Sequence, residues 1–363
     1  MRSSIAAAVL LLISYLSSPP YSASATPTPT PATSSGWPRR SSPSFLSTTS
    51  PMARPSSTGP PAGRATDTSF STSSISKAFG LPLVPPSLDK SQSFIKGASF
   101  AVMGTTALDL SYFQEHNITS VPPFNSSLSV QIGWFQQLKP SLCSTPKQCD
   151  KYLGKSLFVM GEIGGNDYIY LLAANKTVNE TRAYMPTVAK AIAGGVERLV
   201  ELGAKRIVVP GNLPIGCTPI ILTLYESHSK SDYDEYGCLD KFNDLARYYN
   251  RLLRQEVQAL QKKYNLTKIA FADYFRPVVQ FLQKPAELGF NGGTALVACR
   301  GAGGKYNYNA TAACGHPGAT ACADPSKALN WDGIHLTEKA YGAIAATWLC
   351  GPDAEPTILD LAH

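Results

Sequence analysis

The sequence predicts a single α/β domain in which a parallel sheet is covered by helices on both faces. Short apolar runs alternate with longer amphipathic stretches from residue 98 onwards. Strands that are separated by helices pair in parallel through right-handed crossovers, and both faces of such a sheet are buried. The chain has 363 residues, of which 44% are hydrophobic, and this is enough for one large core.

The first half of this domain contains three predicted strands and one long helix. Residues 98–102 and 156–160 are apolar runs that predict buried strands, and residues 206–209 predict a third. Gly203 predicts the end of the helix that precedes this third strand, since glycine readily adopts the left-handed conformation that follows many helices. The helix is predicted over residues 186–203, with Val188, Ile192, Val196 and Leu199 on one face.

The second half continues the alternation. Residues 239–264 predict a long amphipathic helix, and residues 268–272 predict the next strand. Residues 290–325 are rich in Gly and Cys and predict a loop region pinned by disulfides, and the last helix is predicted over residues 337–349. The inward face of the long helix is predicted to carry Leu239, Phe242, Leu245, Tyr249, Leu252 and Leu260.

The N-terminal residues predict an export signal followed by an irregular leader. Arg2, an apolar run over residues 5–16 and small residues at 23–25 form the pattern of a signal peptide over residues 1–25. The apolar run is too short to cross a bilayer, and no later segment has the roughly 20 apolar residues that a span needs. Residues 26–75 are rich in Ser, Thr and Pro and predict a disordered or O-glycosylated leader. We therefore expect a secreted, extracellular protein without an integral membrane segment, whose globular domain covers residues 76–363.

Cysteines and glycosylation sequons agree with export. Eight cysteines, an even number, predict disulfides in a secreted chain; Cys143 and Cys149 could close a short loop, and the other pairings stay open. No cysteine pair has CxxC spacing, so we expect no zinc site. The net charge of +7 is dispersed along the chain, which argues against a nucleic-acid partner. Six sequons predict N-linked glycans on Asn117, Asn125, Asn175, Asn179, Asn265 and Asn309.

An acid and a histidine near the C-terminus have the spacing of a general base with its orienting partner. Asp332 lies three residues before His335, just ahead of the last predicted helix. The carboxylate can hold one ring nitrogen of His335, while the other takes a proton from a nucleophile. The alternative is a turn in which Asp332 caps the helix that begins near Thr337 and His335 is merely exposed.

Two glycine-rich turns after predicted strands are candidates for oxyanion donors. Ligands of parallel sheets bind beyond the carboxyl ends of the strands, which selects the loops after the first three predicted strands. The backbone N–H of Gly104 can approach a ligand oxygen closely, and the amide of Asn166 offers two uncharged donors. The alternatives are a glycine needed only for turn geometry and an Asn-Asp turn that caps the following helix.

Together these blocks resemble the plant GDSL esterases/lipases of the SGNH hydrolase superfamily. The resemblance covers about residues 76–350 and rests on the segments 97–107, 161–167, 210–217 and 332–335. It implies a flavodoxin-like three-layer α/β/α fold and hydrolysis of carboxylic esters through a serine acyl-enzyme, with no metal or organic cofactor. By position in the family pattern, Gly104 and Asn166 would be the oxyanion donors, His335 the base and Asp332 its partner.

The family's nucleophile motif is missing from the sequence. In the family the serine lies in a Gly-Asp-Ser motif at the end of the first strand, but this chain contains no Gly-Asp-Ser and no apolar strand between residues 25 and 75. Ser99 and Ser156 lie at or before the start of predicted strands, so the nucleophile is unassigned and the first strand is expected to be missing or corrupted. An empty central position would leave backbone groups unpaired at about 1–3 kcal/mol each. Residues 63–67 resemble the family's segment after the first strand and the chain resembles it again from Ser76, whereas residues 68–75 do not. We therefore hypothesise that much of residues 26–75 is a frameshifted or mis-joined block.

Three functions follow from these observations. The favoured one is a secreted hydrolase of small-molecule, lipid or carbohydrate esters. The second is a catalytically inactive relative that binds acylated lipids or cell-wall carbohydrate esters without cleaving them. The third, a structural extracellular glycoprotein with a Ser/Pro stalk, rests on the composition of the leader alone.

Overall fold

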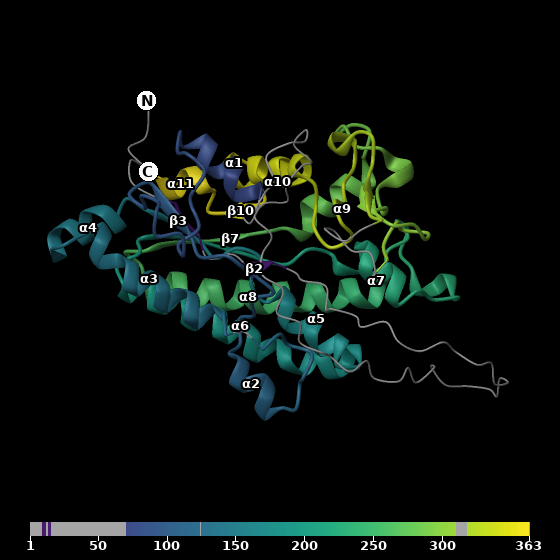
Figure 1. The fold of residues 1–363 in the computed structure, drawn as a ribbon, viewed down its shortest axis with the longest axis horizontal. Coiled ribbons are helices and arrows are strands. Elements are labelled where there is room, and N and C mark those ends of the chain that lie inside the picture. Colours follow the sequence, from purple (N-terminus) through teal and green to yellow (C-terminus); the bar gives the residue numbers. More distant parts are fainter. Residues whose placement is uncertain (1–8, 12–13, 16–69, 124, 310–317, 363) are drawn as a thin grey trace.

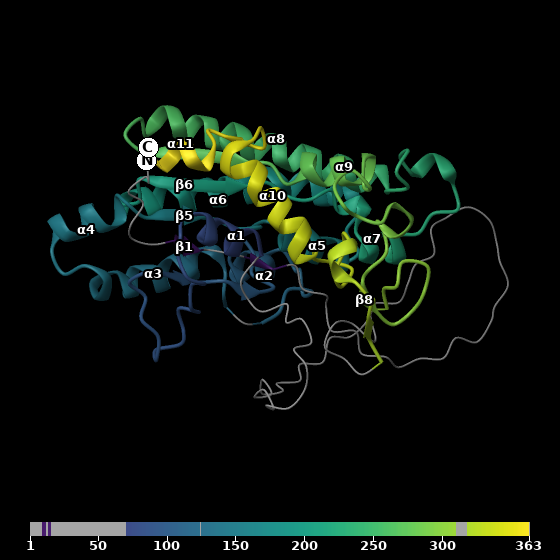
Figure 2. The ribbon, with the colours of Figure 1, turned by 90° about the horizontal axis from the view of Figure 1, so that it is seen from above.

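The computed structural model describes residues 9–11, 14–15, 70–123, 125–309 and 318–362, and its centre is a six-stranded sheet. The sheet contains β1 (Val9–Leu11), β3 (Gly97–Ser99), β5 (Leu157–Val159), β6 (Arg206–Pro210), β7 (Lys268–Ala272) and β10 (Ala354–Glu355). The strand order is β10-β7-β6-β5-β1-β3, and every pair is parallel except β10 with β7. Figure 2 shows β6, β5 and β1 side by side in this order. Two short ladders join β2 (Ser14–Tyr15) to β4 (Val102–Met103) and β8 (Arg300–Gly301) to β9 (Thr320–Ala321).

Helices cover both faces of the sheet, which gives the expected three-layer α/β/α arrangement (Figure 1). They are α1 (Phe70–Ala78), α2 (Leu110–Glu115), α3 (Leu128–Leu142), α4 (Pro146–Leu153), α5 (Gly165–Ala173), α6 (Val178–Glu201), α7 (Pro219–Leu224), α8 (Asp240–Lys263), α9 (Phe275–Gln283), α10 (Glu338–Cys350) and α11 (Ile358–Ala362). In Figure 1, α3, α6 and α8 lie below the sheet, while α1, α10 and α11 lie above it. Among the described residues, no helix is long and apolar enough to cross a bilayer.

The alternation of side chains along the central strands divides the interior into two cores. Phe158, Ile207 and Val209 belong to the core under α3, α6 and α8. Leu157 and Val208, their neighbours in sequence, belong to the core under α1, α10 and α11. Successive side chains of a strand point to opposite faces, so a sheet covered on both sides needs apolar residues at nearly every position. This is why these strands appear as continuous apolar runs in the sequence.

The central position of the sheet is occupied, and the expectation that the first strand is missing is wrong for this structure. β1 pairs in parallel with β3 on one side and with β5 on the other, over all three of its residues. These residues belong to the apolar run that predicts the signal peptide, so the sheet reaches outside the predicted domain boundary at residue 76. An empty slot would leave N–H and C=O groups of two buried strands without partners. A segment that fills the slot removes this cost, and an apolar segment can be buried there.

The other predicted elements are present with shifted boundaries. The apolar run over residues 98–102 divides between β3 and β4. α6 begins at Val178 instead of residue 186, because Thr177 and Glu180 form a capping box ahead of it, and Pro186 is accommodated inside the helix. On α8, Leu252 is only half-buried, whereas its neighbour Leu253 is fully buried.

Candidate active site

His335 and Asp332 form a buried pair in the loop that precedes α10. Nδ1 of His335 lies 2.7 Å from Oδ2 of Asp332, and the two side chains are 7% and 9% exposed. Oδ1 of Asp332 accepts the backbone N–H groups of Ile334 (3.0 Å) and His335 (2.9 Å). Both carboxylate oxygens are therefore engaged, and the orientation of the ring is fixed. With Nδ1 bonded to the carboxylate, Nε2 is the ring nitrogen that can take up a proton during catalysis.

The alternative reading, in which Asp332 caps the last helix and His335 is exposed, is wrong. Thr337 is the N-cap of α10, and its Oγ1 accepts the N–H of Ala340 at 3.4 Å. Asp332 lies too early in the loop for that role and bonds the imidazole instead. The burial of His335 also separates it from an ordinary surface histidine.

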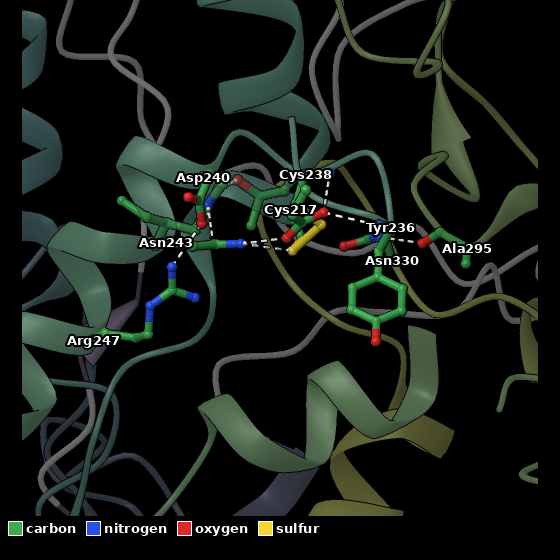
Figure 3. The surroundings of a disulfide bond; sticks show 12 residues. Cys217, Tyr236, Cys238, Asp240, Asn243, Arg247, Ala295 and Asn330 are labelled. Carbon is green, nitrogen blue, oxygen red and sulfur yellow. Dashed lines mark hydrogen bonds and ion pairs between the residues drawn. A yellow bond between two sulfur atoms is a disulfide. The ribbon is translucent and has the colours of Figure 1, made fainter. Parts of the chain in front are cut away.

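Hydrogen bonds from neighbouring segments hold the loop of Asp332 and His335 in place. The N–H of Ile220 in α7 donates to the carbonyl of Gly333 at 3.0 Å. Nδ2 of Asn330 donates to the carbonyl of Ala295 at 2.7 Å (Figure 3). Gly333 has φ +93°, and a Cβ there would lie 2.5 Å from the ring of Tyr308. Only glycine fits this position, which lies between the acid and the histidine.

The electrostatic balance keeps Asp332 ionised. Burial alone would raise the pKa of its carboxyl group, because a charge is costly in a medium of low dielectric. The attraction of His335 and the hydrogen bonds from its ring and from two backbone N–H groups outweigh this cost, so the pKa of Asp332 is lowered. Such a carboxylate can stabilise a protonated imidazole without taking its proton.

Gly104 lies in the tight turn that follows β4. Its φ of +80° is a conformation that favours glycine, and its carbonyl accepts a hydrogen bond from Oη of Tyr170 at 3.3 Å. The turn geometry that the alternative reading proposes is therefore present. It is compatible with a donor role for the backbone N–H of Gly104, which stays a prediction.

Asn166 and Asp167 bond the start of α5 to this same turn. Nδ2 of Asn166 donates to the carbonyl of Thr105 at 2.7 Å. The carboxylate of Asp167 accepts the N–H groups of Ala107 (2.8 Å) and Leu108 (2.9 Å). Both side chains are fully buried, and the N-cap of α5 is a glycine, so the capping alternative does not describe their main contacts. Hydrogen bonds thus join the segments that carry the two predicted oxyanion donors.

Sequence reasoning missed the structural role of Asp167. Burial raises the pKa of this carboxyl group to about 7, although the N–H groups of Ala107 and Leu108 oppose the shift. The signal that could have identified Asp167 was an acid directly after Asn166, at the start of an apolar helix.

Hydrogen bonds and a disulfide connect the segment over residues 210–217 to the start of α8. The N–H of Gly216 donates to Oδ1 of Asn243 at 2.9 Å, and Nδ2 of Asn243 lies 3.4 Å from Sγ of Cys217. Cys217 forms a disulfide with Cys238, and this cross-link joins the turn after β6 to the start of α8 (Figure 3). A Cβ at Gly216 would lie 2.2 Å from the carbonyl oxygen of Leu239, so the turn can pack this closely only with glycine.

The serines near the site differ in their position on the sheet. Ser156 precedes β5 at its amino end, as expected, whereas the expected position of Ser99 at the start of a strand is wrong, because Ser99 is the last residue of β3. The side chain of Ser99 is buried, and its Oγ accepts the N–H of Ala101 at 3.4 Å. Ser14 opens β2, shortly after the central strand β1, and pairs with Val102, two residues before Gly104. β2 also lies against α5, the helix that carries Asn166. The backbone therefore brings Ser14 beyond the carboxyl end of the central strand.

Three disulfides are present among the described residues, and the predicted loop between Cys143 and Cys149 is confirmed. The pairs are Cys143–Cys149, Cys217–Cys238 and Cys299–Cys322. Cys350 is free and exposed, and Cys314 falls outside the described residues. All six sequon asparagines are exposed, which makes them accessible for glycans; their glycosylation stays a prediction.

Comparisons with known proteins identify a family to which the chain is similar. Residues 34–348 match the family model of the GDSL-like lipases/acylhydrolases. A GDSL esterase/lipase of Arabidopsis thaliana is 41% identical over 301 residues, which cover 81% of this chain and 81% of the relative. The sinapine esterase of Brassica napus is 41% identical over 299 residues, which cover 82% of this chain and 76% of that protein.

Proposed function

Because this chain belongs to the GDSL-like lipase/acylhydrolase family, we propose that it is an exported carboxylic ester hydrolase in which His335 is the general base. The observation that carries this proposal is the buried pair of His335 and Asp332, joined at 2.7 Å. A fixed imidazole beside an ionised carboxylate is what an acyl transfer to serine requires of its base.

The reaction would proceed through an acyl-enzyme. Nε2 of His335 removes the proton of a serine hydroxyl while the serine oxygen attacks the carbonyl carbon of the ester. The N–H of Gly104 and the amide of Asn166 stabilise the negative charge that develops on the carbonyl oxygen. The imidazolium then gives its proton to the departing alcohol, and water hydrolyses the acyl-enzyme by the same route. Asp332 remains ionised throughout, which its lowered pKa supports.

We propose Ser14 as the serine of this reaction, since no Gly-Asp-Ser motif is present in the chain. The register of β2 against β4 supports this choice, because Ser14 pairs with Val102 in the strand that leads to Gly104. The contact between β2 and α5 supports it from the side of Asn166. In the family pattern the serine ends the first strand of the sheet; Ser14 follows β1 and precedes residues 34–348, which match the family model.

Export is supported by the disulfides and by the exposed sequons. Cleavage of a signal peptide after Ala25 would remove both β1 and Ser14 from the folded chain. We therefore expect hydrolysis only from molecules that keep their N-terminal segment. Intact-mass measurement of the exported protein, combined with an activity assay on each form, tests this expectation.

A short p-nitrophenyl ester and the purified full-length chain test the hydrolase proposal. We expect turnover by the wild type, and loss of turnover to the uncatalysed background in Ser14→Ala and in His335→Ala. Ser99→Ala is the matched control, because Ser99 is buried in β3 and has no proposed role; its rate should stay within about twofold of the wild type.

Each result separates the competing functions. If Ser14→Ala is as active as the wild type while His335→Ala is inactive, the hydrolase proposal stands and the assignment of the nucleophile fails. If the folded wild type binds an acylated ligand and never turns it over, the chain is a binding protein and the hydrolase proposal fails.

A further inference from the structure

Glu162 is a buried acid beside the proposed base that the reaction above does not use. It lies in the turn between β5 and α5, two residues ahead of Gly164, and its exposed fraction is 6%. Oη of Tyr341, on α10, donates to its Oε2 at 3.4 Å, and Tyr274 donates to the same carboxyl group. The rings of Tyr274 and Tyr341 meet edge to face, with centroids 6.2 Å apart. The carboxyl group of Glu162 is therefore oriented by two tyrosines that belong to the core under α1, α10 and α11.

The same acid lies within electrostatic range of His335. The attraction between Glu162 and His335 is, after burial, the largest influence on the ionisation of Glu162. The surroundings of the imidazole therefore include two carboxyl groups: Asp332, which is bonded to its Nδ1, and Glu162, which is bonded to Tyr341 on the helix that follows His335. Asp332 already fixes the orientation of the ring, so Glu162 is not needed for that purpose.

Retaining an acid at this place is unfavourable for stability at neutral pH. Burial raises the pKa of Glu162 from its ordinary value of 4.5 to about 6, although His335, Tyr274 and Tyr341 oppose the shift. The folded chain therefore holds this proton more tightly than the unfolded chain, and stability is lost as the pH rises from about 4.5 to about 6. A neutral side chain of the same shape would avoid this loss. Costly groups of this kind are typical of functional sites.

We propose that Glu162 is a positioning residue that stabilises the protonated form of His335 and links the turn of Asn166 to helix α10 through Tyr341. This inference rests on the proposed function, because Glu162 would act in the step in which Nε2 of His335 holds the proton of the serine. In that step its carboxylate would stabilise the positive charge of the imidazolium. Glu162 exchanges no proton with the substrate. Its negative charge is greatest above about pH 6, where the base has to accept a proton.

The groups that face Glu162 come from each element packed around it. They are His335 with its partner Asp332 from the loop before α10, Tyr341 from α10, Tyr274 from the residue before α9, and Tyr168 from α5. The charge of Glu162 raises the pKa of Tyr168 further, in addition to the effect of burial, so Tyr168 stays neutral over the working range. Glu162, whose pKa is raised to about 6, is consequently the acid of this cluster that changes charge near neutral pH.

The test is Glu162→Gln, which keeps the shape and removes the charge. We expect kcat on a short p-nitrophenyl ester to fall about tenfold, with KM changed less than twofold, because the lost attraction acts on the protonated imidazole and not on substrate binding. The urea midpoint of the variant should exceed that of the wild type at pH 8, and this gain should disappear at pH 4.5. Tyr341→Phe keeps the charge and should lower kcat by a smaller factor.

Glu338→Gln is the matched control. Glu338 is an exposed acid in the first turn of α10, so its replacement changes the net charge equally without touching the site. We expect its kcat and its pH dependence of stability to match the wild type. If Glu162→Gln is less stable at both pH values and keeps its kcat, Glu162 is only a structural residue and the proposal is overturned.

An NMR titration of the His335 ring separates this proposal from the proposed function. In Glu162→Gln the midpoint of the titration should move to lower pH by about one unit relative to the wild type, which corresponds to a tenfold change in proton affinity. This readout needs no turnover. A shifted midpoint in a chain without esterase activity would support the electrostatic role of Glu162 and reject hydrolysis, whereas an unchanged midpoint would overturn the role itself.

Discussion

Removing β1 should unfold the domain, although only three residues of the sheet are lost. β1 is paired on both sides, so its removal leaves N–H and C=O groups of β3 and β5 without partners in the middle of the sheet. The residues of both neighbouring strands are buried. Each unsatisfied group costs about 1–3 kcal/mol, so about four such groups cost about 4–12 kcal/mol. The whole stability of a domain is only about 5–15 kcal/mol.

The deletion of residues 1–25 and the substitution Leu10→Pro are two independent forms of this perturbation. Proline removes the N–H of the middle residue of β1 and is tolerated poorly in a central strand. Leu10→Ile is the matched control, since it keeps the N–H and a residue type that favours strands. We expect the first two variants to lose their cooperative urea transition, measured by far-UV circular dichroism, and the control to stay within about 1 kcal/mol of the wild type.

The result that would refute this reasoning is a deletion variant with the urea midpoint and the activity of the full chain. The sheet would then be complete without residues 9–11, and the assignment of Ser14 as nucleophile would fail together with it. Loss of the transition in Leu10→Ile as well would show that the segment is sensitive to any change, so the specific role of its backbone pairing would also be rejected.

Four further predictions concern the site, the interior and the processing of the chain. Asp332→Asn should lower kcat on a p-nitrophenyl ester by roughly a thousandfold or more, because the amide no longer stabilises the imidazolium of His335; a loss below tenfold in steady-state kinetics would contradict the proposed pairing. Asp167 has a pKa raised to about 7, so the wild type should lose stability as the pH rises from about 4 to about 7. Asp167→Asn should remove this pH dependence. In urea titrations, the difference in unfolding free energy between the two proteins should change by about 4 kcal/mol between pH 4 and pH 8. Parallel pH profiles of the two proteins would contradict the raised pKa of Asp167. Treatment of the exported protein with an N-glycan-removing enzyme should reduce its intact mass, and an unchanged mass would show that the exposed sequons are not used. Sequencing of the transcript across residues 20–95 should confirm the present frame, because β1 already fills the central position of the sheet; an alternative frame with an apolar strand and Gly-Asp-Ser would instead support the frameshift hypothesis and reject Ser14 as the nucleophile.

The fold class could be predicted because the strands of a doubly covered parallel sheet are apolar throughout. β5, β6 and β7 stand out as such runs between amphipathic helices. The start of α6 was missed because a proline inside a helix usually signals its end, and here the capping box at Thr177 and Glu180 stabilises the first turns that precede Pro186. β1 was missed because an apolar run at the N-terminus has the same composition whether it serves as an export signal or as a buried strand.

The candidate site could be predicted in part, for a different physical reason. Asp332 and His335 are close in sequence, and a spacing of three residues suffices to bring a carboxylate to a ring nitrogen. The contacts that join Asn166 and Asp167 to the turn of Gly104 bridge about sixty residues, and a sequence alone contains no measure of that proximity. The role of Glu162 depends on two tyrosines from the other core and was equally hidden.

Three buried carboxyl groups around the site respond differently to pH, and this links activity to stability. The pKa of Asp332 is lowered, whereas burial raises the pKa of Glu162 to about 6 and that of Asp167 to about 7. Near pH 5, Asp332 is ionised while the other two groups are mainly protonated, and near pH 8 all three are charged. A raised folded-state pKa means that stability is lost as the group ionises, so stability should fall over this interval. The base His335 works in its neutral form and gains a second negative neighbour over the same interval, so hydrolysis should rise. We therefore expect the pH of maximal activity to lie above the pH of maximal stability.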